Sequence, residues 1–321
     1  MSRKKIHEIK LLTGISILLV VAGHLASRGA VDIPLYVAFK KMLYKFHMPL
    51  FMFLSGFIAF YSYTPIKSRK SYFNFVQKKT TRFLPAYLIL SAVFILGKYL
   101  LSNSTNFIQS ILDALFFPSN SAASFLWYIY VLYMYYLILP LIFSFKNKLI
   151  VFLPFCFVIS FFDFTKFMAL HSFFWYLPFF ISGGIVSLNY NFFNKMSKKF
   201  GLLSLLIFII WCILEFNYIV NMPKQIVAVF SIIGLHYFVT FVSKKNTFIE
   251  MLGENTFYIY LFNSLFIGAI NVFLIGLLGK DLYYDLFYYL APILVIVGVI
   301  LPILLHKHII SKLPVIKNWI K

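Results

Sequence analysis

The sequence predicts an all-α integral membrane protein that crosses the bilayer several times. Its 321 residues are 62% hydrophobic and only 12% charged, which is about half the charged fraction of a soluble globular domain. Many apolar runs approach the roughly 20 residues that a helix needs to span a bilayer. These runs are continuously apolar and lack the alternation of a membrane β-barrel strand. We therefore expect one membrane-embedded domain over residues 1–321.

About ten spans are expected from these runs, each end being defined to within a few residues. The fifth is short and aromatic, so it is expected to be tilted or incomplete. Residues 106–117 have the amphipathic pattern of a helix that lies on the membrane surface. The spans cover roughly residues 11–27, 47–63, 83–101, 124–145, 148–163, 168–188, 201–219, 225–243, 256–278 and 284–305.

The basic residues indicate the orientation of these spans. About 21 of the 29 Lys and Arg lie on alternate connections that share one side with both termini, and the positive-inside rule places that side in the cytoplasm. The net charge of +20 is therefore explained by topology, and nucleic-acid binding is not expected. We predict a multi-pass protein of the cell membrane, surrounded by membrane lipid. No side-chain cluster has metal-ligand spacing, so no metal site is expected.

A histidine near the outer end of the first expected span is the main candidate for chemistry. His24 lies in an otherwise uncharged stretch from Leu11 to Ala26. An ionisable side chain inside the membrane is costly and is a functional candidate by default. An imidazole also exchanges protons near neutral pH. The alternative is a histidine that only hydrogen-bonds to a neighbouring helix.

Helical spacing places two further residues near the face of His24. Thr13 lies eleven residues earlier in the chain, which is about three turns and roughly 16 Å along the axis. Lys10 falls within about 40° of the same face, at the cytoplasmic end of the span. A long anionic donor held at Lys10 would then present its reactive end to His24.

Several motifs follow one another along the chain. The second span carries Phe46-His47-Met48-Pro49-Leu50-Phe51-Met52-Phe53-Leu54-Ser55-Gly56-Phe57, and the third is entered through Lys78-Lys79-Thr80-Thr81-Arg82-Phe83-Leu84-Pro85. Later matches are Phe125-Leu126-Trp127-Tyr128, Phe179 to Gly184, Leu252-Gly253 and Tyr258-Ile259-Tyr260-Leu261. Together with Gly14, the Leu18 to Val21 run and His24, this series resembles the membrane acyltransferase-3 family over nearly the whole chain.

The resemblance implies transfer of an acyl group, usually acetyl from acetyl-CoA, to a sugar hydroxyl of a surface polysaccharide or its lipid-linked precursor. Acyl-CoA is then a donor substrate, and no permanently bound cofactor is implied. His24 matches the family's catalytic histidine and would act as a general base or carry the acyl group transiently. Lys79 and Arg82 match a basic motif and would hold the phosphates of CoA. The alternative is topogenic charge attracted to anionic lipid.

Two positions depart from the family pattern. Thr13 stands where the family usually has arginine, and Asn263 stands where it often has histidine. A hydroxyl cannot replace a bidentate guanidinium on phosphate, so Lys10, Lys79 or Arg82 would supply the charge. The departures imply either a changed donor site or weakened activity.

Three further residues have two interpretations each. His47 would position the acceptor or donate to the developing oxyanion, or it is an interfacial anchor. Glu215 would orient His24 as the third member of a relay, or it is a protonated or snorkelling residue near the outer end of its span. Trp127 would stack on a sugar ring, or it belongs to an interfacial aromatic belt.

A glycan exporter without acyl chemistry is the competing interpretation of the whole chain. Sparse charge within many spans fits that class, and His24 with the basic segment would then guide an anionic lipid-linked sugar. The sequence leaves open the acceptor sugar and its hydroxyl, the choice between acetyl and succinyl, and the oligomeric state.

Overall fold

The computed structural model of the protein is all-α, as the sequence predicts. The structure describes residues 6–26, 33–101, 106–242 and 247–312, and these ranges contain helices but no strand. Eight helices among them are long and apolar enough to cross a membrane. The fold class of a polytopic helical membrane protein is therefore confirmed. The number of crossings and the side on which the termini lie remain predictions.

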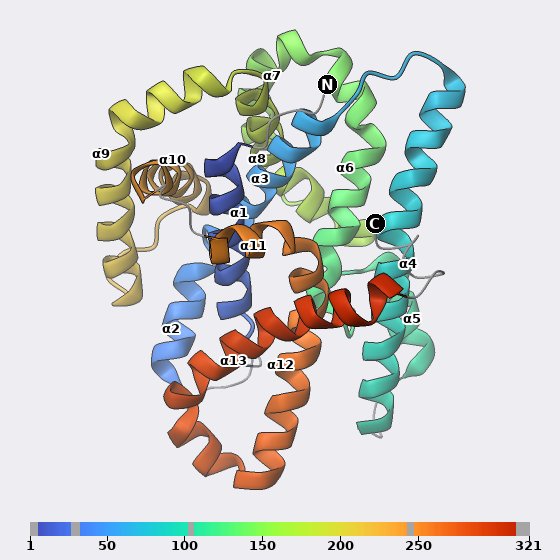
Figure 1. The fold of residues 1–321 in the computed structure, drawn as a ribbon, viewed down its shortest axis with the longest axis vertical. Helices are drawn as coiled ribbons and strands as arrows, with labels where there is room; N and C mark the ends of the chain where they lie inside the picture. The colour runs from blue at the N-terminus through green and yellow to red at the C-terminus, as the bar shows by residue number, and fades with distance from the viewer. Residues whose placement is uncertain (1–5, 27–32, 102–105, 243–246, 313–321) are drawn as a thin grey trace. The chain divides into compact units, whose positions relative to one another are not determined.

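The chain divides into two compact units, and the division falls inside one helix, α3. Unit 1 comprises Met1–Leu54 and Asn189–Ile309, and unit 2 comprises Ser55–Leu188 and Ile310–Lys321. Each unit is described by itself (Figure 1).

The helices of unit 1 come from the two ends of the chain. They are α1 (His7–Ala22), α2 (Pro34–Leu43), the first part of α3 (His47–Ser62), α9 (Tyr190–Phe216), α10 (Lys224–Val242), α11 (Thr247–Glu254), α12 (Thr256–Leu278) and α13 (Lys280–His308).

Unit 2 contains the remaining helices. They are the rest of α3, α4 (Arg69–Leu101), α5 (Phe107–Phe116), η1 (Ser124–Leu126), α6 (Trp127–Ser144), η2 (Lys146–Lys148), α7 (Leu149–Ile159), η3 (Phe167–Ala169), α8 (Leu170–Leu188) and η4 (Ile310–Lys312).

Helix α1 is the packing centre of unit 1, because α10, α11, α12 and α13 all contact it. Helices α9 and α10 pack against each other, as do α12 and α13 (Figure 1). Gly14 and Gly253 let α1 and α11 approach at backbone distance, since a Cβ on Gly14 would overlap Ile249 and one on Gly253 would overlap Lys10. Small residues at a membrane helix contact allow this close approach.

Unit 2 is also held by small residues at helix contacts. A Cβ on Gly56 would overlap the backbone of Phe180, and one on Gly184 would overlap the ring of Phe60. Helices α3 and α8 therefore meet closely within this unit. Gly56 serves this packing, since small residues let membrane helices approach closely.

Element boundaries differ from the sequence prediction at several helices. Helices α1 and α7 are only 16 and 11 residues long, so the first and fifth expected spans are shorter than predicted. Helices α2 and α11 were not expected. Helix α4 begins at Arg69 rather than near residue 83, because residues 69–82 combine good helix formers with few apolar ones. The amphipathic helix expected at residues 106–117 is confirmed as α5.

Candidate active site

His24 lies in a turn directly after α1, which corrects the expectation that it lies inside this helix. The helix ends at Ala22, and the His24 amide donates to Val21 O at 2.9 Å in a tighter turn. The Tyr36 hydroxyl stands where the next helical bond would form. It donates to Ala22 O at 3.1 Å and accepts from Leu25 N at 2.9 Å. A group inserted into the helical ladder ends the helix there, so Thr13 and His24 do not share one helical face.

Two other aromatic side chains extend from His24 toward the start of α3. The ring centroids of His24 and Tyr44 are 6.5 Å apart, and those of Tyr44 and His47 are 4.9 Å apart. We call His24, Tyr44 and His47 the imidazole–phenol row. The row brings together two of the residues that the sequence singles out, His24 and His47.

His47 is buried, which argues against a role as an interfacial anchor. It is 2% exposed, and its Nδ1 lies 2.7 Å from Leu43 O. A carbonyl only accepts hydrogen bonds, so Nδ1 carries the proton and Nε2 of the neutral ring is an acceptor. Nε2 of neutral His47 is therefore an acceptor only, and it cannot donate to an oxyanion from that atom.

Glu215 is paired with a lysine, which departs from both sequence interpretations. Its carboxylate lies 2.8 Å from Lys45 Nζ, and the two side chains are only 1% and 7% exposed. Lys45 also donates to the Asn221 amide oxygen at 2.5 Å. Burial excludes a snorkelling carboxylate, and the pairing with Lys45 takes the place of the expected relay to His24.

Thr13 and Asn263 are buried and turned toward their own helices. The Thr13 hydroxyl donates to Ile9 O at 2.7 Å. The Asn263 amide donates to Ile259 O and Tyr260 O, each at 2.8 Å. Their donors are therefore used within α1 and α12, and neither side chain presents an N–H or O–H group to a ligand in this arrangement.

Lys10 lies between two carboxylates at the beginning of α1. Its Nζ is 3.0 Å from Glu250 and 2.9 Å from Glu254, both on α11. His7 Nδ1 lies 3.3 Å from Glu250 as well. The hydrogen bond that Lys10 donates to Glu254 is the main reason that the pKa of Lys10 is raised above its ordinary value, with Glu250 adding to it. The positive charge of Lys10 is therefore already compensated within the protein.

The basic pair of unit 2 lies on α4, facing tyrosines. Lys79 Nζ is 3.8 Å from the ring centroid of Tyr136, and Phe83 stacks on the same tyrosine at 5.4 Å. A desolvated ammonium so close to a ring forms a strong cation–π contact. Arg82 lies within electrostatic range of the Tyr136 hydroxyl. Both cations are half-buried, so they are not ordinary solvated charges on an interfacial loop.

Trp127 is the first residue of α6 and is half-buried in unit 2. Its ring stacks on Tyr176 at 4.9 Å with an interplanar angle of 25°. The next residue, Tyr128, shares a 2.6 Å hydrogen bond with Ser55. One face of the Trp127 indole is therefore used in protein packing.

Comparison with known families decides the class of this protein. The family model for the acyltransferase domain of the acyltransferase 3 family matches residues 6–307. The chain belongs to the acyltransferase 3 family. No match was found among curated proteins or among solved structures. The family match extends over both units, so the acyltransferase domain includes the His24 turn as well as the Lys79–Arg82 pair.

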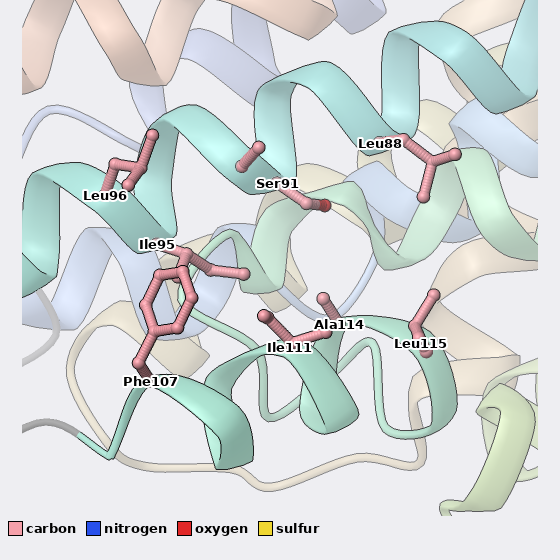
Figure 2. Close-up of a pocket in the computed structure, with 9 residues that line it drawn as sticks. Leu88, Ser91, Ile95, Leu96, Phe107, Ile111, Ala114 and Leu115 are labelled. Atoms are coloured by element: carbon pink, nitrogen blue, oxygen red, sulfur yellow. The ribbon is translucent and has the colours of Figure 1, made fainter.

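An apolar cavity lies between α4 and α5 in unit 2 of the acyltransferase (Figure 2). Its volume is about 210 Å³, and its lining comprises Leu88, Ser91, Ala92, Ile95, Leu96, Phe107, Ile111, Ala114 and Leu115. This lining contains no cationic side chain, so the cavity cannot neutralise the phosphates of a CoA donor. An apolar lining of this kind favours hydrocarbon over charged groups.

Several polar residues around the site of the acyltransferase were not singled out from the sequence. They are Tyr36, Lys40, Tyr44, Lys45, Glu250, Asn271 and Tyr283. Asn271 lies in an apolar run, and the reasoning that selects Glu215 would also have selected it. Among the described residues, no group of three His, Cys, Asp or Glu could hold a metal ion.

Proposed function

We propose that this acyltransferase transfers an acetyl or other small acyl group from acyl-CoA to a sugar hydroxyl of a surface polysaccharide or its lipid-linked precursor. The observation that carries the proposal is the His24 imidazole, fixed on a turn whose backbone is bonded by side chains of neighbouring helices. Membership of the acyltransferase 3 family supports an acyl-transfer role for that imidazole.

The reaction follows from general base catalysis. His24 takes the proton of the acceptor hydroxyl while the hydroxyl oxygen attacks the carbonyl carbon of the thioester. The tetrahedral intermediate collapses, the carbon–sulfur bond breaks, and the CoA thiolate leaves and recovers the proton from His24. His47 is buried, so it would help to position the acceptor through its contact with Tyr44 in the imidazole–phenol row rather than by touching the sugar.

The donor phosphates are assigned to Lys79 and Arg82. Lys10 already lies between two glutamates, and the Thr13 hydroxyl is bonded to its own helix. Lys79 and Arg82 are half-buried cations on one helix, three residues apart. Charge-assisted bonds from such groups to phosphate are stronger than neutral ones, so this pair replaces the family arginine missing at Thr13.

The test is acyl transfer by purified protein with labelled acetyl-CoA and surface glycan as acceptor. His24→Ala should reduce kcat by about 10²- to 10⁴-fold, the usual contribution of a general base. His308→Ala is the matched control, because His308 is exposed at the end of α13. Transfer by His24→Ala at the wild-type rate would show that this imidazole has no catalytic role.

The donor assignment has its own test. Lys79→Gln and Arg82→Gln should each raise KM for acetyl-CoA by about 10- to 100-fold, since a lost charge-assisted hydrogen bond is worth roughly 1.5–3 kcal/mol. Lys78→Gln controls for loss of one positive charge, because Lys78 is exposed on the same helix. An unchanged KM in both variants would place the donor phosphates elsewhere.

Cells that lack the protein distinguish the transferase from a glycan exporter. Loss of an acetyl or succinyl mass from surface glycan, at an unchanged amount of glycan, supports acyl transfer. Accumulation of intracellular precursor with unmodified mass would instead support export.

A further inference from the structure

We propose that Asn271, held by Tyr283, is a positioning residue for His24. The proposal rests on the proposed catalytic role of His24. It assigns to the α12–α13 pair the task of fixing the turn on which the imidazole stands. Neither residue touches the reacting atoms, so both act through the backbone of this turn.

The backbone on both sides of His24 is bonded by side chains. Tyr44 donates to Gly23 O at 3.0 Å, and Asn271 Nδ2 donates to Leu25 O at 2.8 Å. The Lys40 ammonium donates to Ala26 O at 2.9 Å. Together with the Tyr36 hydroxyl, these groups replace the helical bonds that the turn lacks.

Asn271 is suited to this role because both ends of its amide are engaged. Its Oδ1 accepts a 2.9 Å hydrogen bond from the Tyr283 hydroxyl, which leaves Nδ2 directed to Leu25 O. Tyr283 is 2% exposed, so its phenol is itself fixed by packing. An asparagine within an apolar membrane helix is costly unless such bonds satisfy it.

The consequence for catalysis is geometric. The Leu25 carbonyl belongs to the Leu25–Ala26 peptide, one peptide after the bond that joins His24 to Leu25. Releasing it frees the turn to rotate, and this rotation moves the imidazole. A misplacement of about 1 Å costs roughly 10²-fold in rate. Binding of the CoA phosphates, which we assign to other residues, should not change. A loss in kcat without a change in KM for the donor is therefore the expected signature.

The kinetic test compares Asn271→Leu, Tyr283→Phe and the double variant. Asn271→Leu should lower kcat by about 10- to 100-fold, and Tyr283→Phe should lower it less. The double variant should resemble Asn271→Leu, because residues that act as one unit are not additive. Tyr289→Phe is the control, since Tyr289 is on the same helix and 79% exposed. An unchanged kcat in Asn271→Leu would overturn the proposal.

A second measurement does not depend on turnover. Amide hydrogen exchange of the peptide spanning Leu25 and Ala26, and carbethoxylation of His24 by diethyl pyrocarbonate, should both accelerate in Asn271→Leu and Tyr283→Phe. Faster exchange with unchanged kcat would reduce the contact to a structural one and overturn the positioning role. If wild-type protein transfers no acyl group, the proposed function fails. Faster carbethoxylation of His24 in Asn271→Leu and Tyr283→Phe would still support the positioning role. Should Asn271→Leu fail to fold, Tyr283→Phe removes one oxygen and supplies the same test.

Discussion

Unit 1 contains two lysine–glutamate sites that have the same chemistry and different surroundings. Lys10 is 20% exposed and meets Glu250 and Glu254, which are 20% and 46% exposed. The Lys45–Glu215 pair has side chains that are only 7% and 1% exposed. Water and ions screen the first site but not the second. The comparison indicates that removing one partner is costly at the buried pair, because the other charge is left without water or a counter-ion, whereas the Lys10 site tolerates such a change.

The largest effect is expected when the buried pair is broken. Glu215→Ala leaves the Lys45 ammonium buried without its carboxylate, which typically costs about 3–5 kcal/mol of unfolding free energy. Denaturant titration of the protein in mixed micelles measures the loss.

Removing both charges sharpens this prediction. Glu215 Oε2 has no hydrogen-bond partner among the described residues, so the pair is incompletely satisfied. The double variant Lys45→Met/Glu215→Leu should therefore recover most of the stability lost in Glu215→Ala. If the double variant remained as unstable as Glu215→Ala, Lys45 or Glu215 would have to stabilise the fold through contacts other than their mutual ion pair.

An intermediate effect is expected from separating α11 from α1. Gly253→Ala places a methyl group against the Lys10 backbone, and overpacking of this kind costs about 1–3 kcal/mol. Because the shift also moves Glu250 and Glu254 away from Lys10, ion-pair energy should be lost with it. The same denaturant titration measures the effect. Equal stability of Gly253→Ala and wild type would contradict the close approach of these helices.

The smallest effect is expected from Lys10→Met. Partly exposed ion pairs contribute about 0.2–1 kcal/mol, and the contribution should fall with salt. The pKa of Lys10 is raised in the folded state, so the stabilisation is complete below the ordinary lysine pKa of about 10.4. It is lost only as the pH rises through the higher folded value. The contrast with Lys45 would disappear if Lys10→Met lowered the free energy of unfolding by several kcal/mol. It would also disappear if the stabilisation by Lys10 were already titrated away near neutral pH.

The sequence predicts most of the spans because hydropathy reports burial in lipid directly. It does not predict the start of α4, since residues 69–82 are helical without being apolar. Nor does it predict the end of α1, which depends on the Tyr36 hydroxyl from a helix that begins later in the chain. The hydropathy pattern of residues near the end of α1 gives no information about a contact with a later helix.

The candidate site was predictable to a similar degree. His24 and Glu215 stand out as polar residues in apolar runs, and His47 belongs to a recognisable motif. The partner of Glu215 was not predictable, because Lys45 lies far away in the sequence and pairs with it only in the folded chain. Asn271 could have been selected by its composition alone, but its role depends on contacts with both Leu25 and Tyr283.

The shortness of α1 has a consequence for the lipid around it. Its 16 residues measure about 24 Å at the rise of an α-helix, whereas the hydrocarbon layer is about 30 Å thick. If α1 crosses, this mismatch is met by local thinning of the bilayer beside unit 1 or by flanking residues that reach the interface. For the acyl-CoA donor proposed above, a thinner layer would shorten the path between a nucleotide held at one surface and an acyl group used near the other. Local thinning of the membrane, rather than movement of the protein between its two sides, would then bring the proposed acyl group to the proposed sugar acceptor.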